Sequence, residues 1–172
     1  MSRRAVALAL LCMAACGCGY HTAGHIKTLP EDIHTIAVPA FINQSQTYRV
    51  EQKLTAAVVR EFVTRTNYHV VNAPGQAADA TLQGTVLNTS AVPATYDSQT
   101  GRAASVDVVV IMRVSLTDRR GKVLYDNASY VFRDQYQVSR ELSSFFEENS
   151  PALDRLSREF ARTLVSNILE GF

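Results

Sequence analysis

Residues 104–118, "ASVDVVVIMRVSLTD", are a long stretch in which apolar and polar residues alternate. Every second residue from Val106 to Leu116 is apolar, whereas Asp107, Arg113 and Ser115 occupy the positions between them. Because side chains of a β-strand point alternately to its two faces, this pattern predicts a strand with one buried face and one wetter face. An apolar sheet face has to be covered by another layer, so the remaining elements must supply one.

Further strands are predicted on both sides of this stretch. Turn sequences separate them: "NAPGQAAD" precedes residue 80, and "DRRGK" follows residue 117. Gly101 lies at a natural hairpin tip, because glycine adopts the backbone angles that such tips require. The five predicted strands span residues 34–41, 68–72, 80–92, 104–118 and 123–136.

Two segments show helical periodicity. The first is predicted at roughly residues 48–65, and Ser45 or Thr47 is the expected cap of its first turn. The second begins after Ser150, the expected cap, with Pro151 at the first helical position. Its apolar stripe consists of Leu153, Leu156, Phe160, Leu164 and Ile168.

The predicted element order is β-α-β-β-β-β-α, with one strand before the first helix. This order predicts an α+β fold in which two helices pack on one face of a mixed four- to five-stranded sheet. The length of the chain, 172 residues, suits one domain.

The N-terminus reads as a secretory signal. "MSRR" is positively charged, and residues 5–15 are apolar but too short to span a bilayer, which needs about 20 residues. All three cysteines of the chain, at positions 12, 16 and 18, lie within or directly after this run. Small residues lead into Cys16 and Cys18, as in bacterial lipoprotein precursors, so either cysteine is a candidate for lipid attachment after cleavage.

Two other readings of the cysteines remain open. One is a plain secretory signal. The other is a metal or redox pair, although no second cysteine pair exists to complete such a site. With lipid attachment, the chain divides into a signal peptide at 1–17, a lipidated tether at 18–33 and a folded domain at 34–172, which contains no disulfide.

The net charge and the motifs of the sequence argue against several classes of function. Without Arg3 and Arg4 the chain has 15 basic and 16 acidic residues, so net charge gives no field for nucleic acid. No phosphate-binding glycine loop, nucleophile elbow or metal-binding helix is present, and His25, His34 and His69 have no evident catalytic partners. The sequence therefore predicts no enzyme activity, no metal and no cofactor.

The N-terminus and the element order together resemble the LptE family, the lipopolysaccharide-assembly lipoproteins of the Gram-negative outer membrane. The "CGYH" of residues 18–21 looks like the start of a mature family member. The strand and helix of "IAVPAFINQSQTYRVEQKLTAAVVREF", residues 36–62, are also similar to a divergent branch of the family. Residues 78–86, the hairpin at 96–125 and the final helix complete the resemblance.

The resemblance implies a specific role. It favours Cys18 over Cys16 as the lipidated residue, and it implies an acyl-anchored protein on the periplasmic face of the outer membrane. There it would plug the lumen of the LptD barrel, help that barrel assemble, and assist lipopolysaccharide insertion. The resemblance also implies that basic residues near the hairpin tip and the following strand contact lipopolysaccharide. In this chain the candidates are Arg102, Arg133 and Arg140.

A second reading is a periplasmic lipoprotein of similar fold with another partner, such as an activator of a peptidoglycan synthase or a subunit of a secretion channel. These also begin with an "IAV-x-x-F-x-N" strand, which residues 36–43 match. The "CGYH" start and the long hairpin favour the LptE reading. A secreted enzyme is the third and weakest reading.

Overall fold

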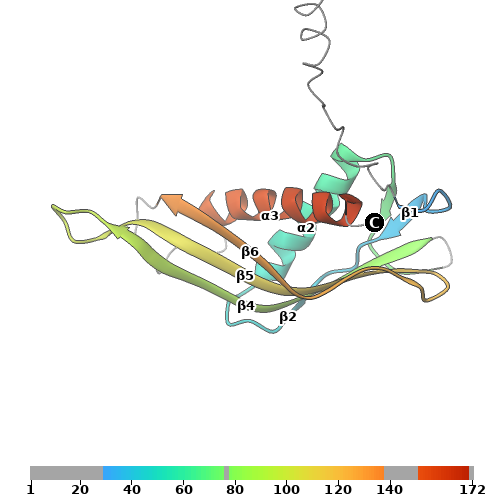
Figure 1. The fold of residues 1–172 in the computed structure, drawn as a ribbon, viewed down its shortest axis with the longest axis horizontal. Helices are drawn as coiled ribbons and strands as arrows, with labels where there is room; N and C mark the ends of the chain where they lie inside the picture. The colour runs from blue at the N-terminus through green and yellow to red at the C-terminus, as the bar shows by residue number, and fades with distance from the viewer. Residues whose placement is uncertain (1–28, 76–77, 138–150, 171–172) are drawn as a thin grey trace, which may run out of the picture.

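The computed structural model describes residues 29–75, 78–137 and 151–170. It contains a mixed six-stranded sheet in the order β3-β1-β4-β5-β6, with β2 paired to β4 off this path. The strands are β1 (Thr35–Ala37), β2 (Ile42–Asn43), β3 (His69–Val71), β4 (Ala80–Tyr96), β5 (Ala103–Asp118) and β6 (Val123–Gln137). Two helices, α2 (Val50–Arg65) and α3 (Pro151–Glu170), lie on one side of the sheet (Figure 1). The predicted α+β architecture is confirmed.

The sheet combines two pairing modes. β1 pairs in parallel with β3 and β4, whereas β4, β5 and β6 form a long antiparallel meander. The predicted strands at 80–92, 104–118 and 123–136 match β4, β5 and β6 closely, and β4 continues to Tyr96. β2 was not predicted, since residues 42–43 fall between the strand predicted at 34–41 and the helix predicted from residue 48. It forms because Ile42 and Asn43 pair in parallel with Thr85 and Val86.

The core lies between the sheet and the two helices. The apolar residues of β5 that alternation predicted to share a face are all fully buried there. Phe160 of α3 makes edge-on contacts with Tyr130 and Phe132 of β6, at ring-centroid distances of 6.0 and 5.7 Å. The apolar stripe of α2, spaced by four residues, packs into the same core, and its members are Val50, Leu54, Val58 and Phe62.

The start of α2 differs from the prediction. The residue before the helix is Arg49, in a left-handed conformation with φ 55°, and no side chain caps the first turn. Ser45 and Thr47 do not act as caps because their hydroxyls hold the preceding loop instead. Ser45 Oγ donates to Asn43 Oδ1 at 2.8 Å, and Thr47 Oγ1 lies 2.6 Å from Thr89 Oγ1 on β4. Ser150, the predicted cap of α3, lies outside the described residues.

Asp79 joins three segments at one end of the sheet. Its Oδ2 accepts hydrogen bonds from the backbone N–H groups of His34 and Thr35, both at 2.9 Å. Its backbone N–H donates to Thr35 O, and its carbonyl accepts from Arg119 N–H. These N–H groups favour the ionised carboxylate and lower the pKa of Asp79, with a smaller effect from the Arg119 guanidinium.

The chain enters the domain at this same end. Leu29 and Ile33 are buried in the core although they precede β1. Both fall within residues 18–33, the predicted tether, so the last part of that span packs against the domain.

Gly84 supports a close contact inside the β4 strand. A Cβ atom added at this position would lie 2.7 to 2.9 Å from three ring atoms of Phe41, which is itself buried. We expect Gly84→Ala to lower the free energy of unfolding by about 1–3 kcal/mol, because the Phe41 ring must shift within a packed core. Urea unfolding followed by circular dichroism measures the change.

Gly75→Ala is the matched control for this substitution. An added Cβ at Gly75 would meet no atom within 4 Å. Equal unfolding midpoints for the two variants would show that the contact between Phe41 and Gly84 is not tight.

The lowered pKa of Asp79 leads to a prediction of how the free energy of unfolding depends on pH. Because the pKa of its carboxyl is lowered in the folded state, its contribution is present above the unfolded pKa, about 4, and is lost as pH falls through the lower folded value. We expect the unfolding free energy of the wild type to fall more steeply below about pH 5 than that of Asp79→Asn, which cannot ionise.

At neutral pH the Asp79→Asn variant should be less stable by about 1–2 kcal/mol, because charge-assisted hydrogen bonds are replaced by neutral ones. Urea titrations at a series of pH values measure both effects. Asp126→Asn, at an exposed position of β6, is the control. Parallel curves for the wild type and Asp79→Asn would contradict the assignment.

Candidate functional site

One face of the β4–β5–β6 meander carries no helix among the described residues, and we call it the open face (Figure 1). Cross-strand register places Val92 beside Asp107, and Val109 between Ser90 and Arg133. The centre of the open face is therefore apolar and its borders are polar. Its principal residues are Gln83, Asn88, Ser90, Val92, Asp107, Val109, Ile111, Arg113, Val131, Arg133 and Gln135.

Charged groups on the open face are few and separated. Asp107 accepts a hydrogen bond from Gln135 Nε2 at 3.1 Å across the β5–β6 ladder. Arg113 and Arg133 are both exposed and lie on either side of the apolar centre. Such a surface can bind a ligand that combines anionic groups with apolar parts, since guanidinium groups match phosphates and carboxylates by charge and geometry.

The hairpin between β4 and β5 ends in a tightly bonded tip. Asp97 Oδ1 accepts hydrogen bonds from Gln99 N–H at 3.0 Å and from Thr100 N–H at 2.7 Å, and also from the Thr100 hydroxyl. These donors, Thr100 first, lower the pKa of Asp97. Gly101, with φ 68°, supplies the left-handed residue that the turn needs. The carboxylate therefore orders the tip rather than forming an ion pair with Arg102.

The structure separates the predicted basic residues. Arg102 is exposed at the tip, and Arg133 is exposed on β6 opposite Val109. Position 102 lies seven residues before position 109, a distance of roughly 23 Å along the strand direction. The two arginines do not form one cluster. Arg140, the third candidate, and Cys16 and Cys18, the lipid-attachment candidates, lie outside the described residues.

Arg113 is a site residue that sequence reasoning missed. Arg113 lies four residues from Val109, the residue of β5 that pairs with Arg133. The distance along the strand from Arg113 to the level of Arg133 is therefore roughly 13 Å, shorter than the distance from Arg102 to Arg133. The signal was present in the alternation of residues 104–118, which puts Arg113 on the wetter face. Its relation to Arg133 became visible only when the strand register was known.

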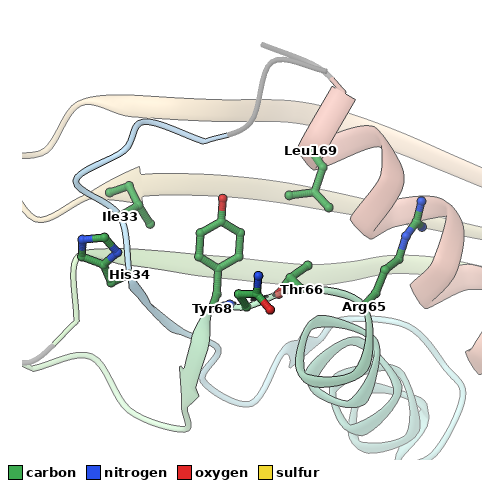
Figure 2. Close-up of a pocket in the computed structure, with 7 residues that line it drawn as sticks. Ile33, His34, Arg65, Thr66, Tyr68 and Leu169 are labelled. Carbon is green, nitrogen blue, oxygen red and sulfur yellow. Dashed lines mark hydrogen bonds between the residues drawn. The ribbon is translucent and has the colours of Figure 1, made fainter. Parts of the chain in front are cut away.

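A separate cavity of about 340 Å³ lies where the chain enters the domain. Figure 2 shows Tyr68 rising between Ile33 and Leu169, with Arg65 on the side nearest α3. Arg65 Nη1 donates to Ser166 Oγ and to the Arg162 carbonyl, and burial raises the pKa of Tyr68. The lining is mixed: the apolar side chains of Ile33 and Leu169 stand beside polar ones, which are His34, Arg65, Thr66, Asn67 and Tyr68. It includes no carboxylate or thiol to act with these groups in catalysis.

Metal sites and membrane-spanning helices are absent from the described part of the chain. It contains no group of three or more His, Cys, Asp or Glu side chains that could hold a metal ion. Neither of its helices is both long and apolar enough to cross a membrane. The surfaces that remain are the open face, the hairpin tip and the edges of the sheet.

These features define a class of protein: a small α+β domain whose two helices cover one face of a mixed sheet and whose exposed features are surfaces rather than a catalytic pocket. A family model described as LptE, lipopolysaccharide-assembly, matches residues 33–168. The chain therefore belongs to the LptE family, as the sequence analysis predicted.

Solved structures share the fold. The hypothetical protein CT253 from Chlamydia trachomatis is similar with a TM-score of 0.52 and 10% identity, over 81% of this chain and 99% of that one. The PelC dodecamer from Paraburkholderia phytofirmans is similar with a TM-score of 0.51 and 15% identity, over 80% and 89%. At these identities the likeness is one of fold alone. No curated protein sequence matches the chain.

Proposed function

We propose that this chain is a lipid-anchored protein of the outer membrane that occupies the lumen of an LptD-type barrel. There it helps the barrel to assemble and to deliver lipopolysaccharide. The observation that carries the proposal is membership of the LptE family over residues 33–168, joined to the lipoprotein-like start at residues 1–18. Acyl chains on Cys18 would hold the domain beside the barrel and raise its effective concentration there.

The surface of the domain suits a polar lumen. Large barrels have polar interiors, so a plug needs a rigid body without a large apolar patch. The exposed large apolar side chains come from β2, β4, β6, α2 and the loop before α2, rather than from a single element. They are Ile42, Tyr48, Val63, Val92, Tyr96, Val123 and Val131.

The shape of the domain supports an orientation within the barrel. Residues 29–33 and the tip of the β4–β5 hairpin lie at opposite ends of the domain (Figure 1). β5 has 16 residues and spans roughly 50 Å, more than the 30 Å of a typical hydrocarbon core. With the anchor in the periplasmic leaflet, the hairpin can extend along the lumen across the whole membrane.

Lipopolysaccharide contact is the finer part of the proposal. Arg102 at the tip, and Arg113 and Arg133 on the open face, are exposed guanidinium groups that can bind phosphates. They lie at intervals along the hairpin, which suits successive contacts with a moving amphiphile better than one tight site. Arg140 remains a candidate outside the described residues.

The proposal includes no catalytic step. An enzyme would need converging acid, base or nucleophile groups, and the described residues bring none together. The alternative reading is a peptidoglycan-synthase activator or a secretion-channel subunit of similar fold. It gains no support from the solved structures, because they resemble this chain in fold alone.

Mass spectrometry of the mature protein tests the anchor, and purification in mild detergent tests the partner. We expect an N-terminal acylated Cys18, and a barrel polypeptide recovered with the wild type but not with Cys18→Ser. Cys16→Ser is the matched control and should behave as the wild type. An unmodified N-terminus, or normal barrel levels in cells depleted of this protein, would refute the proposal.

Lipopolysaccharide binding by the purified full chain tests the arginines. We expect Arg102→Ala, Arg113→Ala and Arg133→Ala each to weaken binding about fivefold or more, because each removes a charge-assisted contact. Arg158→Ala, which changes an exposed residue of α3 on the helix side, should leave binding unchanged. Equal losses in all four variants would indicate only a general charge effect.

A further inference from the structure

Within residues 29–75, 78–137 and 151–170, β6 is the last strand of the sheet and pairs along one edge, with β5. In the strand order β3-β1-β4-β5-β6, the described residues include no strand beyond β6. Its register with β5 runs without interruption from Tyr130 to Gln137. The two irregularities of this strand lie earlier, between Asn127 and Tyr130 and between Val123 and Tyr125. We call residues 131–137 the β6 edge.

Pro93 reveals which main-chain groups of the β6 edge point outward. It lies opposite Val106 in the β4–β5 ladder and has no N–H to donate, so this pair is a non-hydrogen-bonded one. Val106 therefore directs its N–H and C=O groups to the other side, towards Tyr136 of β6. The N–H and C=O groups of successive residues of a strand point alternately to its two edges, and those of Tyr136 point towards β5. The N–H and C=O groups of Val131, Arg133 and Gln135 therefore point away from β5.

A second observation agrees with this assignment. The Gln135 N–H donates to Asp134 Oδ1 at 2.8 Å, so it is turned to the outer side of the strand. For Val131 and Arg133 no side chain of the described residues accepts the corresponding N–H. The β6 edge therefore presents the N–H groups of Val131 and Arg133 as available donors, whereas the Gln135 N–H is already bonded to its neighbour's carboxylate. Outward carbonyls alternate with these donors in the spacing that another strand would need.

The β6 edge is also held rigidly in place. Two of the three residues that alternate with the outward-facing ones, Phe132 and Tyr136, are buried against the helix layer, whereas Asp134 is exposed. Phe132 packs edge-on against Phe160. The edge contains no proline and no bulge, two of the devices by which natural edge strands avoid pairing. An incoming strand would meet a template that is already ordered, which lowers the entropic cost of pairing.

The charge pattern disfavours pairing with a second copy of this chain. Two copies could pair their β6 edges antiparallel about a two-fold axis. If the axis passes through Asp134, residues 131–137 of one copy pair with the same residues of the other, and the two Asp134 carboxylates lie opposite each other. A two-fold at Arg133 sets two guanidinium groups opposite each other. Like charges directly opposite destabilise a strand pair, so a second copy is disfavoured in these two registers, and a polypeptide that places a carboxylate opposite Arg133 fits better.

We propose that the β6 edge binds an extended segment of the barrel polypeptide by adding it to the sheet as a further strand. The inference rests on the proposed function, which supplies the partner. Strands within the barrel wall are already paired on both edges, so the segment comes from a loop or another part outside the wall. A carboxylate of that segment is favoured opposite Arg133.

Val131→Pro tests the proposal, because proline removes an outward N–H and obstructs an incoming strand while leaving the β5–β6 hydrogen bonds in place. Val123→Pro is the matched control: Val123 is also exposed but is the first residue of β6, where proline is tolerated. We expect Val131→Pro to recover about tenfold less barrel polypeptide in mild detergent than Val123→Pro or the wild type.

The outcomes separate this inference from the proposed function. Equal recovery by Val131→Pro, Val123→Pro and the wild type would overturn the β6 pairing and leave the plug proposal standing. Failure of the wild type to recover any barrel would overturn the proposed function, and the β6 inference with it.

A second measurement applies if Val131→Pro lowers the melting temperature more than Val123→Pro does. A photoreactive amino acid in place of Gln135, in the otherwise native full chain, should crosslink to a peptide of the barrel. A crosslink to a second copy, to residues 138–150 of the same chain, or to nothing would overturn the proposal.

Discussion

The packing of one apolar sheet face against α3 and α2 is the interaction on which the domain depends. All cysteines lie in the first 18 residues, so no disulfide supports the fold. The alternate residues of β5 from Val106 to Leu116 and the aromatic contacts of Phe160 must supply that support instead. Among the residues that the structure describes, the meander is covered on one side, and its other side and the outer edge of β6 are left uncovered. The core thus determines where a partner can bind.

The two ends of the domain differ in how they are held. At the end where the chain enters, Asp79 ties residues 34–35 to β4 and to the β5–β6 turn, and Leu29 is buried. At the far end the hairpin extends as strand pairs alone. A fixed base and a projecting hairpin fit the proposed position of the domain, anchored at one membrane leaflet and extended through a lumen.

Alternation and helical periodicity predicted β4, β5, β6 and both helices to within a few residues, because each is long and buries a regular stripe. Two features required tertiary information. β2 is only two residues long and exists through pairing with β4. The start of α2 depends on Arg49, since Ser45 and Thr47 bond elsewhere. The site residues stay a prediction. The register adds that Arg102 and Arg133 are apart and that Arg113 is another exposed arginine on the same face as Arg133. No sequence signal shows which edge of β6 is open.

The hydrogen bonds of the hairpin tip are all local, linking Asp97 with residues no further away than Arg102. The tip is thus assembled from its own few residues and draws nothing from the distant core. Substitutions or insertions in such a turn should therefore change the stability of the domain little. The tip is the natural place for a fluorophore or an epitope that reports how deeply the domain enters its partner.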